Sequence, residues 1–214
     1  MIINKFRAFL ASQLGFPKGW FGKLLIRFLN SNNAMMNDLV LQHLNLQADD
    51  RVLEIGFGGG YLIEKIANTA LPQLIAGVEQ SQDALDLCEH KFRTQINKSE
   101  IELYLADAMQ LPFADRYVNK ICSVNTIYFW TELSKVFREC FRVLADDGEL
   151  LLSYNSKDFL EKQKFADHGF IGYEVSEIEA ALKMAGFVNV TTITGYSDRH
   201  QEFFCTIATA ALKS

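Results

Sequence analysis

Four glycines within five positions, Gly56 and residues 58–60, are the feature of the sequence with the clearest chemical consequence. They follow a short apolar run at residues 52–55 and precede a segment, from Tyr61 on, whose apolar residues recur with helical spacing. The run is typical of a buried parallel strand, and glycines permit a tight turn because they tolerate positive φ angles. A strand, a glycine turn and a helix N-terminus together bring backbone N–H groups close to a ligand. We therefore expect a nucleotide-like ligand at this turn.

Polar side chains follow three further apolar runs, each at the point where the run ends. These side chains are Glu79, Asp107 and Asn125, after the runs at 74–78, 101–105 and 121–124. Since ligands of parallel sheets bind at the carboxyl ends of the strands, we expect the three residues to share one edge with the glycine turn. Glu79 lies 23 residues after Gly56, a spacing that favours a carboxylate accepting hydrogen bonds from ribose hydroxyls over an ordinary solvent-facing acid.

The glycine pattern separates two classes of nucleotide ligand. A dinucleotide fingerprint has the form G-x-G-x-x-G, but Tyr61 stands at the position of the third glycine. The spacing found is G-x-G-x-G, preceded by the acid Glu54. Without the third glycine, a pyrophosphate cannot approach the helix end closely. The pattern therefore favours a nucleoside ligand without a diphosphate over NAD.

The elements that must position this edge alternate along the chain. Helical spacing predicts helices at residues 2–14, 20–29, 34–46, 61–69, 82–93 and 132–144, with Ser81 as the N-cap of the fifth. Further strands are expected at 149–153, entered through a turn at 146–148, and as a hairpin at 188–193 and 203–208. Ser176 and Glu179 have the spacing of a capping box for one more helix, which ends at Gly186. Alternating strands and helices predict an α/β fold with a doubly wound, mostly parallel sheet of seven strands.

Length and composition are those of one globular domain. The chain has 214 residues, of which 49% are hydrophobic and 22% charged. We predict a single domain over residues 1–214, with an N-terminal helical lid at 1–48, a cofactor-binding core at 49–155 and an acceptor-side segment with the last strands at 156–214. No apolar run reaches the eighteen residues typical of a membrane-spanning helix, so a cytoplasmic protein is expected.

The net charge and the positions of the cysteines and histidines limit which partners and sites we expect. The net charge of −5 argues against nucleic acid. Residues 1–37 carry five basic and no acidic residues, which indicates either contact with an anionic membrane surface or a helix that covers the domain's own core. The four cysteines and four histidines are scattered, so neither a disulfide nor a metal site is predicted.

Four segments together resemble the motifs of the class I S-adenosylmethionine-dependent methyltransferases, in particular a small-molecule branch similar to methyltransferase type 11. The segments are residues 52–60, 78–81, 105–113 and 142–150, which occur in the family's order and span about residues 50–155. The resemblance implies a Rossmann-like fold with an antiparallel last strand, S-adenosyl-L-methionine as the cofactor, and transfer of a methyl group to a small-molecule acceptor. The acceptor atom stays open, and lipid-like acceptors are included. No proline follows Asn125, whereas members that methylate amino groups of nucleic acids usually carry prolines there, which again speaks against nucleic acid.

The resemblance also implies a set of cofactor-binding residues. The set is Glu54, Gly56, Phe57, Gly58, Gly60, Glu79, Gln80, Asp107, Ala108 and Asn125. The glycine turn would pass beside the methionine part of the cofactor, and Glu54 would support that turn. Glu79 would hold the ribose, with Gln80 lining the adenine. Asp107 would meet the adenine amino group and the Ala108 N–H a ring nitrogen, while Asn125 would approach the methionyl end.

No catalytic group follows from the sequence, because methyl transfer mainly requires an acceptor held in line and kept from water. Tyr128 and His168 are candidates for a general base, with lid packing or pocket wall as the alternative interpretation of each. Two other functions stay open: a nicotinamide-dependent oxidoreductase on a similar sheet, disfavoured by Tyr61, and a non-catalytic cofactor-binding member of the same fold. The sequence does not indicate the oligomeric state.

Overall fold

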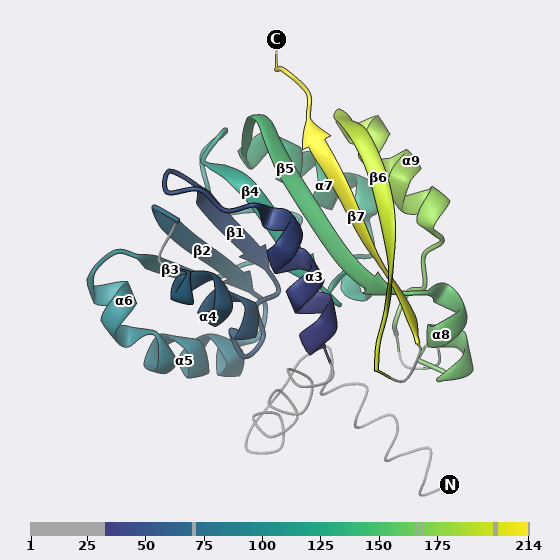
Figure 1. Cartoon of the computed structure of the whole chain (residues 1–214), viewed down its shortest axis with the longest axis horizontal. Helices are drawn as coiled ribbons and strands as arrows, with labels where there is room; N and C mark the ends of the chain where they lie inside the picture. Colours follow the sequence, from purple (N-terminus) through teal and green to yellow (C-terminus); the bar gives the residue numbers. More distant parts are fainter. Residues whose placement is uncertain (1–32, 70–71, 166, 168, 199–200, 214) are drawn as a thin grey trace, which may run out of the picture.

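Seven strands form one twisted sheet in the order β3-β2-β1-β4-β5-β7-β6 (Figure 1). The structure, a computed structural model, describes residues 33–69, 72–165, 167, 169–198 and 201–213. Strands β1 to β5 run parallel, β7 pairs antiparallel with β5, and β6 pairs antiparallel with β7. The predicted class, the mostly parallel sheet and the antiparallel last strand are confirmed. The helices expected at 2–14 and 20–29 lie outside the described residues.

The strands and helices have the following bounds. The strands are β1 (Arg51–Ile55), β2 (Leu74–Glu79), β3 (Ile101–Leu105), β4 (Val118–Val124), β5 (Leu144–Asn155), β6 (Phe187–Tyr196) and β7 (Glu202–Ala210). The helices are α3 (Ala34–Leu44), α4 (Tyr61–Asn68), α5 (Gln82–Lys91), α6 (Arg93–Asn97), the 3-10 helix η1 (Ile127–Phe129), α7 (Leu133–Val143), α8 (Lys157–Lys162) and α9 (Val175–Ala185).

Alternation along the strands builds two cores, one on each face of the sheet. In β1, Val52 belongs to the core under α3, α4 and α5, and the next residue, Leu53, belongs to the core under α7 and α9. In β5, Leu151 and Leu152 divide between the same two cores. Because successive side chains of a strand point to opposite faces, such an uninterrupted apolar run fills both layers. The helices on both faces leave the carboxyl ends of β1, β2 and β4 as the edge where a ligand can enter.

Strand β5 is longer than the prediction of 149–153. It begins directly after α7 and contains the predicted turn at 146–148 as an irregularity within a paired strand. Val118 pairs with Leu144, and the register then shifts before the regular pairing with β4 resumes. A bulge of this kind accommodates extra residues without ending the strand, which is why the turn residues do not mark its start.

Two helix boundaries also differ from the prediction. Helix α9 begins at Val175, and the carboxylate of Glu177 accepts the N–H of Glu174 (2.7 Å). The predicted capping box of Ser176 and Glu179 was therefore wrong. The capping box at the start of α9 is formed two residues earlier, by Glu174 and Glu177. The helix predicted at 82–93 is α5, which ends at Lys91, and α6, a separate short helix that was not predicted, follows after Phe92. Ser81 is confirmed as the N-cap of α5, where its hydroxyl accepts the Ala84 N–H.

Candidate functional site

The glycine turn after β1 has positive φ angles at three of its glycines. These angles are 76° at Gly56, 50° at Gly58 and 66° at Gly60. A Cβ on Gly56 would come within 2.6 Å of the Thr126 hydroxyl oxygen, and one on Gly60 within 2.5 Å of the Phe92 ring. A Cβ on Gly58 would meet no atom within 4 Å. Two glycines are thus fixed by protein packing, while the third faces open space.

The carboxylate of Glu79 closes this turn from the end of β2. One oxygen accepts the Gly58 N–H (3.0 Å), and the other accepts the N–H groups of Gln80 (2.8 Å) and Ser81 (3.0 Å). The predicted strand-end acid therefore lies at the glycine turn. A carboxylate held by several backbone donors keeps a fixed orientation, so Glu79 links the turn to the end of the neighbouring strand.

Glu54 lies beneath the turn and is only 4% exposed. One of its carboxyl oxygens accepts the Ile63 N–H (3.1 Å), so it supports the first turn of α4 directly. Burial raises the pKa of Glu54 to about 8, the Ile63 hydrogen bond acts in the opposite direction, and the nearby charge of Glu79 adds to the increase. The group therefore carries its proton at neutral pH.

Helix α5 braces the same turn from its outer side. The Lys91 ammonium pairs with the Glu64 carboxylate (2.8 Å) and donates to the carbonyl oxygens of Gly59 (3.4 Å) and Gly60 (3.3 Å). The Cys88 thiol donates to the Gly58 carbonyl (3.4 Å). Sequence reasoning missed these contacts, because they join residues about thirty positions apart. They hold the loop carbonyls on the side of α5.

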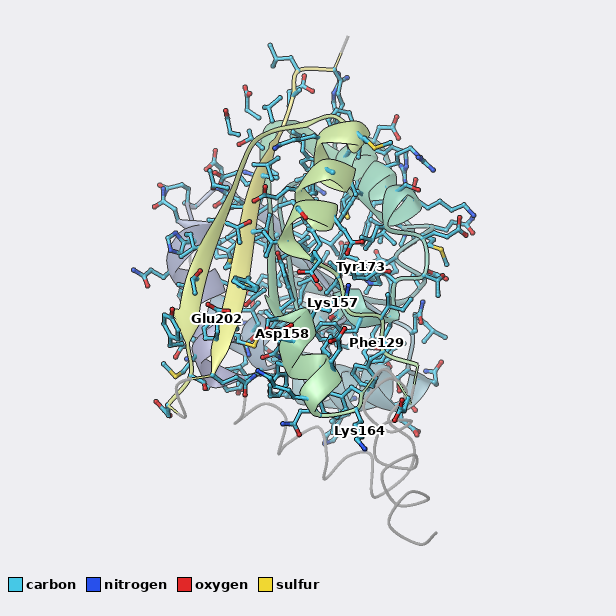
Figure 2. The ribbon with its side chains drawn as sticks, turned by 90° about the vertical axis from the view of Figure 1, so that its right-hand side faces the viewer. Phe129, Lys157, Asp158, Lys164, Tyr173 and Glu202 are labelled. Carbon is cyan, nitrogen blue, oxygen red and sulfur yellow. The ribbon has the colours of Figure 1, made fainter. Side chains whose placement is uncertain are left out.

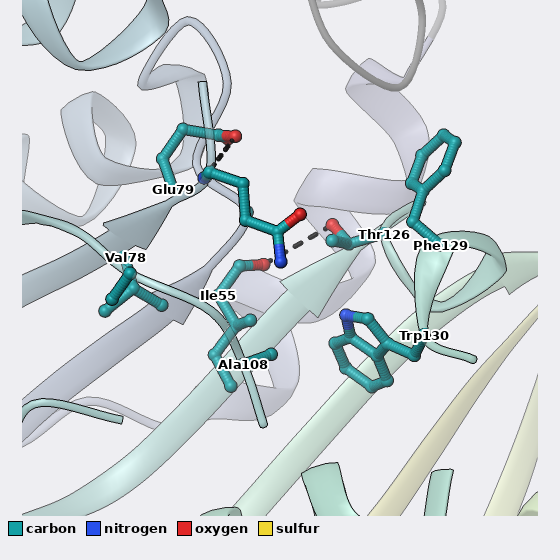
Figure 3. Close-up of a pocket in the computed structure, with 10 residues that line it drawn as sticks. Ile55, Val78, Glu79, Ala108, Thr126, Phe129 and Trp130 are labelled. Carbon is teal, nitrogen blue, oxygen red and sulfur yellow. Dashed lines mark hydrogen bonds between the residues drawn. The ribbon is translucent and has the colours of Figure 1, made fainter. Parts of the chain in front are cut away.

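A pocket opens where the carboxyl ends of β1, β2 and β4 meet (Figure 3). Its lining residues are Ile55, Gly56, Val78, Glu79, Gln80, Ala106, Ala108, Thr126, Phe129 and Trp130. Four of them, Gly56, Glu79, Gln80 and Ala108, belong to the set predicted from the sequence. Thr126 was missed as a ligand-facing residue, because no local pattern in the sequence singles it out. The Thr126 hydroxyl donates to the Ile55 carbonyl (3.4 Å), as Figure 3 shows.

Three other predicted residues lie near the pocket without lining it. Asp107 is half-buried, and one of its carboxylate oxygens accepts the Met109 N–H (2.8 Å). Phe57 is 3% exposed, and its ring packs where a Cβ on Gly77 would stand (2.7 Å), so its side chain belongs to the core. Glu54 lies below the turn. Their predicted roles toward a cofactor stay predictions.

Asn125 has the left-handed backbone conformation, with a φ of 57°. Its amide nitrogen donates to Asn33 Oδ1 (2.8 Å) and contacts the Met36 sulfur (3.2 Å). Its amide oxygen accepts the Tyr128 hydroxyl (2.7 Å) and the Asn155 amide (3.0 Å). A primary amide has two donor hydrogens and two acceptor lone pairs. Within the described chain all four are engaged, so the predicted contact of this side chain with a ligand requires a partner to be exchanged.

Tyr128 is buried, and its hydroxyl has a partner on each side. It donates to Asn125 and accepts the N–H of Asn155. Burial raises the pKa of the Tyr128 hydroxyl well above its ordinary value. A phenol with a raised pKa and an engaged proton is a poor general base at neutral pH. The other candidate, His168, lies outside the described residues.

Two aromatic residues that line the pocket, Phe129 and Trp130, contact further aromatic side chains. The Phe129 and Phe170 rings lie 4.7 Å apart, and Phe170 stacks on Phe165 at 5.1 Å. The Tyr173 hydroxyl donates to the Trp130 carbonyl (2.5 Å). Figure 2 shows Phe129 and Tyr173 on the same side of the molecule as α8. We call these five residues, Phe129, Trp130, Phe165, Phe170 and Tyr173, the aromatic wall. They come from two segments that are distant in the sequence.

Metal ligation and membrane crossing find no support in the part of the chain that the structure describes. There, no three His, Cys, Asp or Glu side chains gather in a way that could hold a metal ion. All four cysteines are buried free thiols. Within the same residues, no helix combines the length and the apolar character that crossing a membrane requires.

Comparisons with known proteins agree on one family. The family described as a methyltransferase domain matches residues 53–152. The uncharacterized methyltransferase YdaC of Bacillus subtilis (strain 168) is 20% identical over 158 residues, which cover 70% of this chain and 85% of that protein. The demethylmenaquinone methyltransferase of Lactobacillus johnsonii is 31% identical over 108 residues, which cover 50% of this chain and 44% of that protein.

Solved structures agree in fold. A SAM-dependent methyltransferase from Aquifex aeolicus aligns with a TM-score of 0.70 at 18% identity, over 87% of this chain and 97% of that chain. The family match at 53–152 contains the glycine turn, Glu79, Asp107 and the Asn125 turn.

Proposed function

This chain belongs to the class I S-adenosylmethionine-dependent methyltransferases, and on that premise we propose that it methylates a small, apolar acceptor that enters against the aromatic wall. The observation that carries the proposal is the composition of the pocket. Its lining combines a nucleoside-type edge, with Glu79 and Ala108, and an aromatic side, with Phe129 and Trp130. A nicotinamide-dependent oxidoreductase is no longer an alternative, because the family is that of methyltransferases.

The residues of the glycine turn fit S-adenosylmethionine. A Cβ on Gly58 would have no protein atom within 4 Å, so a ligand can approach the backbone there. The Glu79 carboxylate suits the ribose hydroxyls, and the half-buried Asp107 suits the adenine amino group. Gln80 and the Ala108 N–H would complete the adenine side, and the turn at Gly56 would receive the methionine part.

The chemistry asks little of the protein beyond position. The cofactor supplies a methyl group on a sulfonium sulfur, which is a good leaving group. Phe129 and Trp130 exclude water and hold an apolar acceptor, and such positioning is worth up to about 7–11 kcal/mol. Because the Tyr128 proton is engaged with Asn125, we assign no general base. A carboxylate or phenolate oxygen has no proton to lose, and a neutral amine attacks through its lone pair and can release a proton to solvent afterwards, so such acceptors need none.

Calorimetric titration and a turnover assay test this function. We expect the protein to bind S-adenosylmethionine and S-adenosylhomocysteine, and to show no affinity for NAD. Turnover is measured as S-adenosylhomocysteine release over a panel of quinol, fatty-acid and polar acceptors, with apolar members preferred. Binding of NAD in place of the two adenosyl ligands would contradict the cofactor assignment.

The same assay addresses the two finer alternatives. Tight binding of S-adenosylhomocysteine with no release on any acceptor would point to a non-catalytic member of the family. Turnover confined to polar acceptors would refute the apolar specificity but leave the methyltransferase assignment intact. Replacement of Phe129 by serine should lower turnover of apolar acceptors while leaving affinity for S-adenosylhomocysteine nearly unchanged.

A further inference from the structure

The turn that follows β4 is held in an unusual conformation beside the pocket. Asn125 has a φ of 57°, a region that non-glycine residues adopt infrequently and that asparagine tolerates best. The backbone N–H of Asn125 donates to the Ser153 carbonyl (2.9 Å) on β5. The turn is thus tied to β5 through the main chain as well as through side chains.

The next residue, Thr126, sets the floor of the pocket. A Cβ on Gly56 would lie 2.6 Å from the Thr126 hydroxyl oxygen, which means that the threonine packs directly against the backbone of Gly56. Both residues line the pocket, and Thr126 faces Ile55 in Figure 3. Any change in the Asn125 turn therefore moves the residue that bounds the glycine turn.

One hydroxyl secures this turn to the neighbouring strand. The Tyr128 hydroxyl bridges the Asn125 amide oxygen (2.7 Å) and the backbone N–H of Asn155 at the end of β5. The tyrosine ring is itself held, with its centroid 5.9 Å from that of Phe170. Asn155 adds a second bond to Asn125 from its side chain (3.0 Å). The Tyr128 hydroxyl therefore connects η1 to both the turn after β4 and the end of β5.

We propose that Tyr128 is a positioning residue of the cofactor site, whose hydroxyl fixes the Asn125 turn and thereby holds Thr126 against Gly56. The inference rests on the proposed function, since it names a residue that shapes the same pocket. It assigns to Tyr128 neither contact with the ligand nor a proton transfer. It also explains why all hydrogen-bonding positions of the Asn125 side-chain amide are engaged: these bonds fix the conformation of the turn.

Tyr154 provides a matched control for a Tyr128→Phe variant. Tyr154 is 1% exposed, compared with 3% for Tyr128, and its hydroxyl bonds to the Thr206 hydroxyl (2.8 Å). Tyr154→Phe thus removes an equally buried phenol oxygen from the same region of the sheet. It leaves Asn125, Thr126 and Gly56 untouched, so a loss of stability alone would be common to both variants.

Titration with S-adenosylhomocysteine separates position from stability. We expect Tyr128→Phe to weaken binding about tenfold, since two hydrogen bonds that fix the turn are lost. Tyr154→Phe should leave the affinity within about twofold of that of the wild type, because the hydroxyl that it removes bonds to Thr206 on β7 and not to the Asn125 turn. Unchanged affinity in Tyr128→Phe, or an equal loss in both variants, would overturn the proposal.

A second variant and a ligand-free measurement cover the remaining outcomes. If Tyr128→Phe does not fold, Asn155→Ala removes the other bond to the Asn125 oxygen and should weaken binding in the same direction, by about threefold; no loss would refute the proposal. If the wild type does not bind S-adenosylhomocysteine at all, the proposed function fails. Amide hydrogen exchange then decides the positioning role, because Tyr128→Phe should speed exchange at Asn125 and Gly56 and Tyr154→Phe should not; equal protection in all three proteins would contradict it.

Discussion

Around the glycine turn, the important groups are backbone atoms and a few side chains from one strand–turn–helix unit and its neighbour. Around η1, by contrast, side chains from distant segments meet: Asn33 reaches Asn125 across 92 residues, and Tyr173 reaches Trp130 across 43. The first region uses conformations that only glycine adopts readily, while the second uses amide and aromatic contacts that many residue types could supply. A common cofactor calls for a fixed backbone shape, whereas an acceptor pocket can vary in its side chains.

The largest effect is expected within the glycine turn, at Gly56. Gly56→Ala places a Cβ against Thr126 at a φ of 76°, which should lower the free energy of unfolding by about 2–5 kcal/mol and abolish binding of S-adenosylhomocysteine. Gly58→Ala is the matched control for stability, because its Cβ meets no protein atom within 4 Å. Urea denaturation of both variants would show whether packing or the backbone angle dominates the loss of stability, and calorimetry of Gly56→Ala measures the loss of binding. Equal losses of stability would mean that the angle alone matters.

The buried acid below the turn gives the second largest effect. The folded protein keeps the Glu54 proton up to about pH 8, whereas the unfolded chain releases it near the ordinary value of 4.5. The folded state therefore binds more protons in this window, and the contribution of Glu54 to the free energy of unfolding falls as pH rises, by at most about 1.4 kcal/mol per pH unit. Glu54→Gln has no such proton to lose. Its stability relative to the wild type should rise between about pH 4.5 and about pH 8, as measured by urea denaturation; a constant difference would contradict the buried, protonated state.

Substitution of Glu79 tests whether cofactor binding at the glycine turn depends on this one carboxylate. Glu79→Ala should weaken binding of S-adenosylhomocysteine by about 1–3 kcal/mol, since the ribose loses a charged acceptor and the Gly58 N–H loses its partner. Asp86→Ala, an exposed carboxylate on α5 that bonds only to Gln82 in the described chain (2.7 Å), is the control for lost negative charge. Calorimetric affinities unchanged in Glu79→Ala would refute the ribose assignment.

The same contrast explains what the sequence could predict. Strand ends, the glycine turn and the position of Glu79 follow from local patterns, because apolar runs and glycines report backbone conformation directly. The class of the sheet follows from the order of those patterns. The Asn125 amide network could not be foreseen, since amide side chains carry no periodic signal and their partners come from α3, β5 and η1.

The bounds of β5 show a second limit. Aspartates and a glycine at 146–148 are typical of a turn, and these residues lie in the bulge between the pairs Val118–Leu144 and Lys120–Glu149. Asp147 has a left-handed φ of 59°, so the turn conformation is present, but pairing with β4 occurs on both sides of it. Likewise, Phe57 stands within a ligand-binding motif, but its ring is directed to the core by the absence of a side chain at Gly77. Tertiary contacts thus decided what spacing alone left undetermined.

The smallest expected effect concerns Asn33, which precedes α3 and accepts a hydrogen bond from the Asn125 side chain. Asn33→Ala removes one hydrogen bond to Asn125 (2.8 Å) and should weaken binding of S-adenosylhomocysteine by at most about 1 kcal/mol, because the turn keeps its bonds to Tyr128 and Asn155. A double-mutant cycle with Tyr128→Phe measures whether the two bonds act on one turn, and we expect the losses to be non-additive. Asp38→Ala, which removes an exposed ion pair between α3 and Lys65 (2.6 Å), is the control for a loosened helix. Additive losses for Asn33→Ala and Tyr128→Phe would mean that Asn33 and Tyr128 act independently, and the two regions of the pocket would then be joined by the main chain alone.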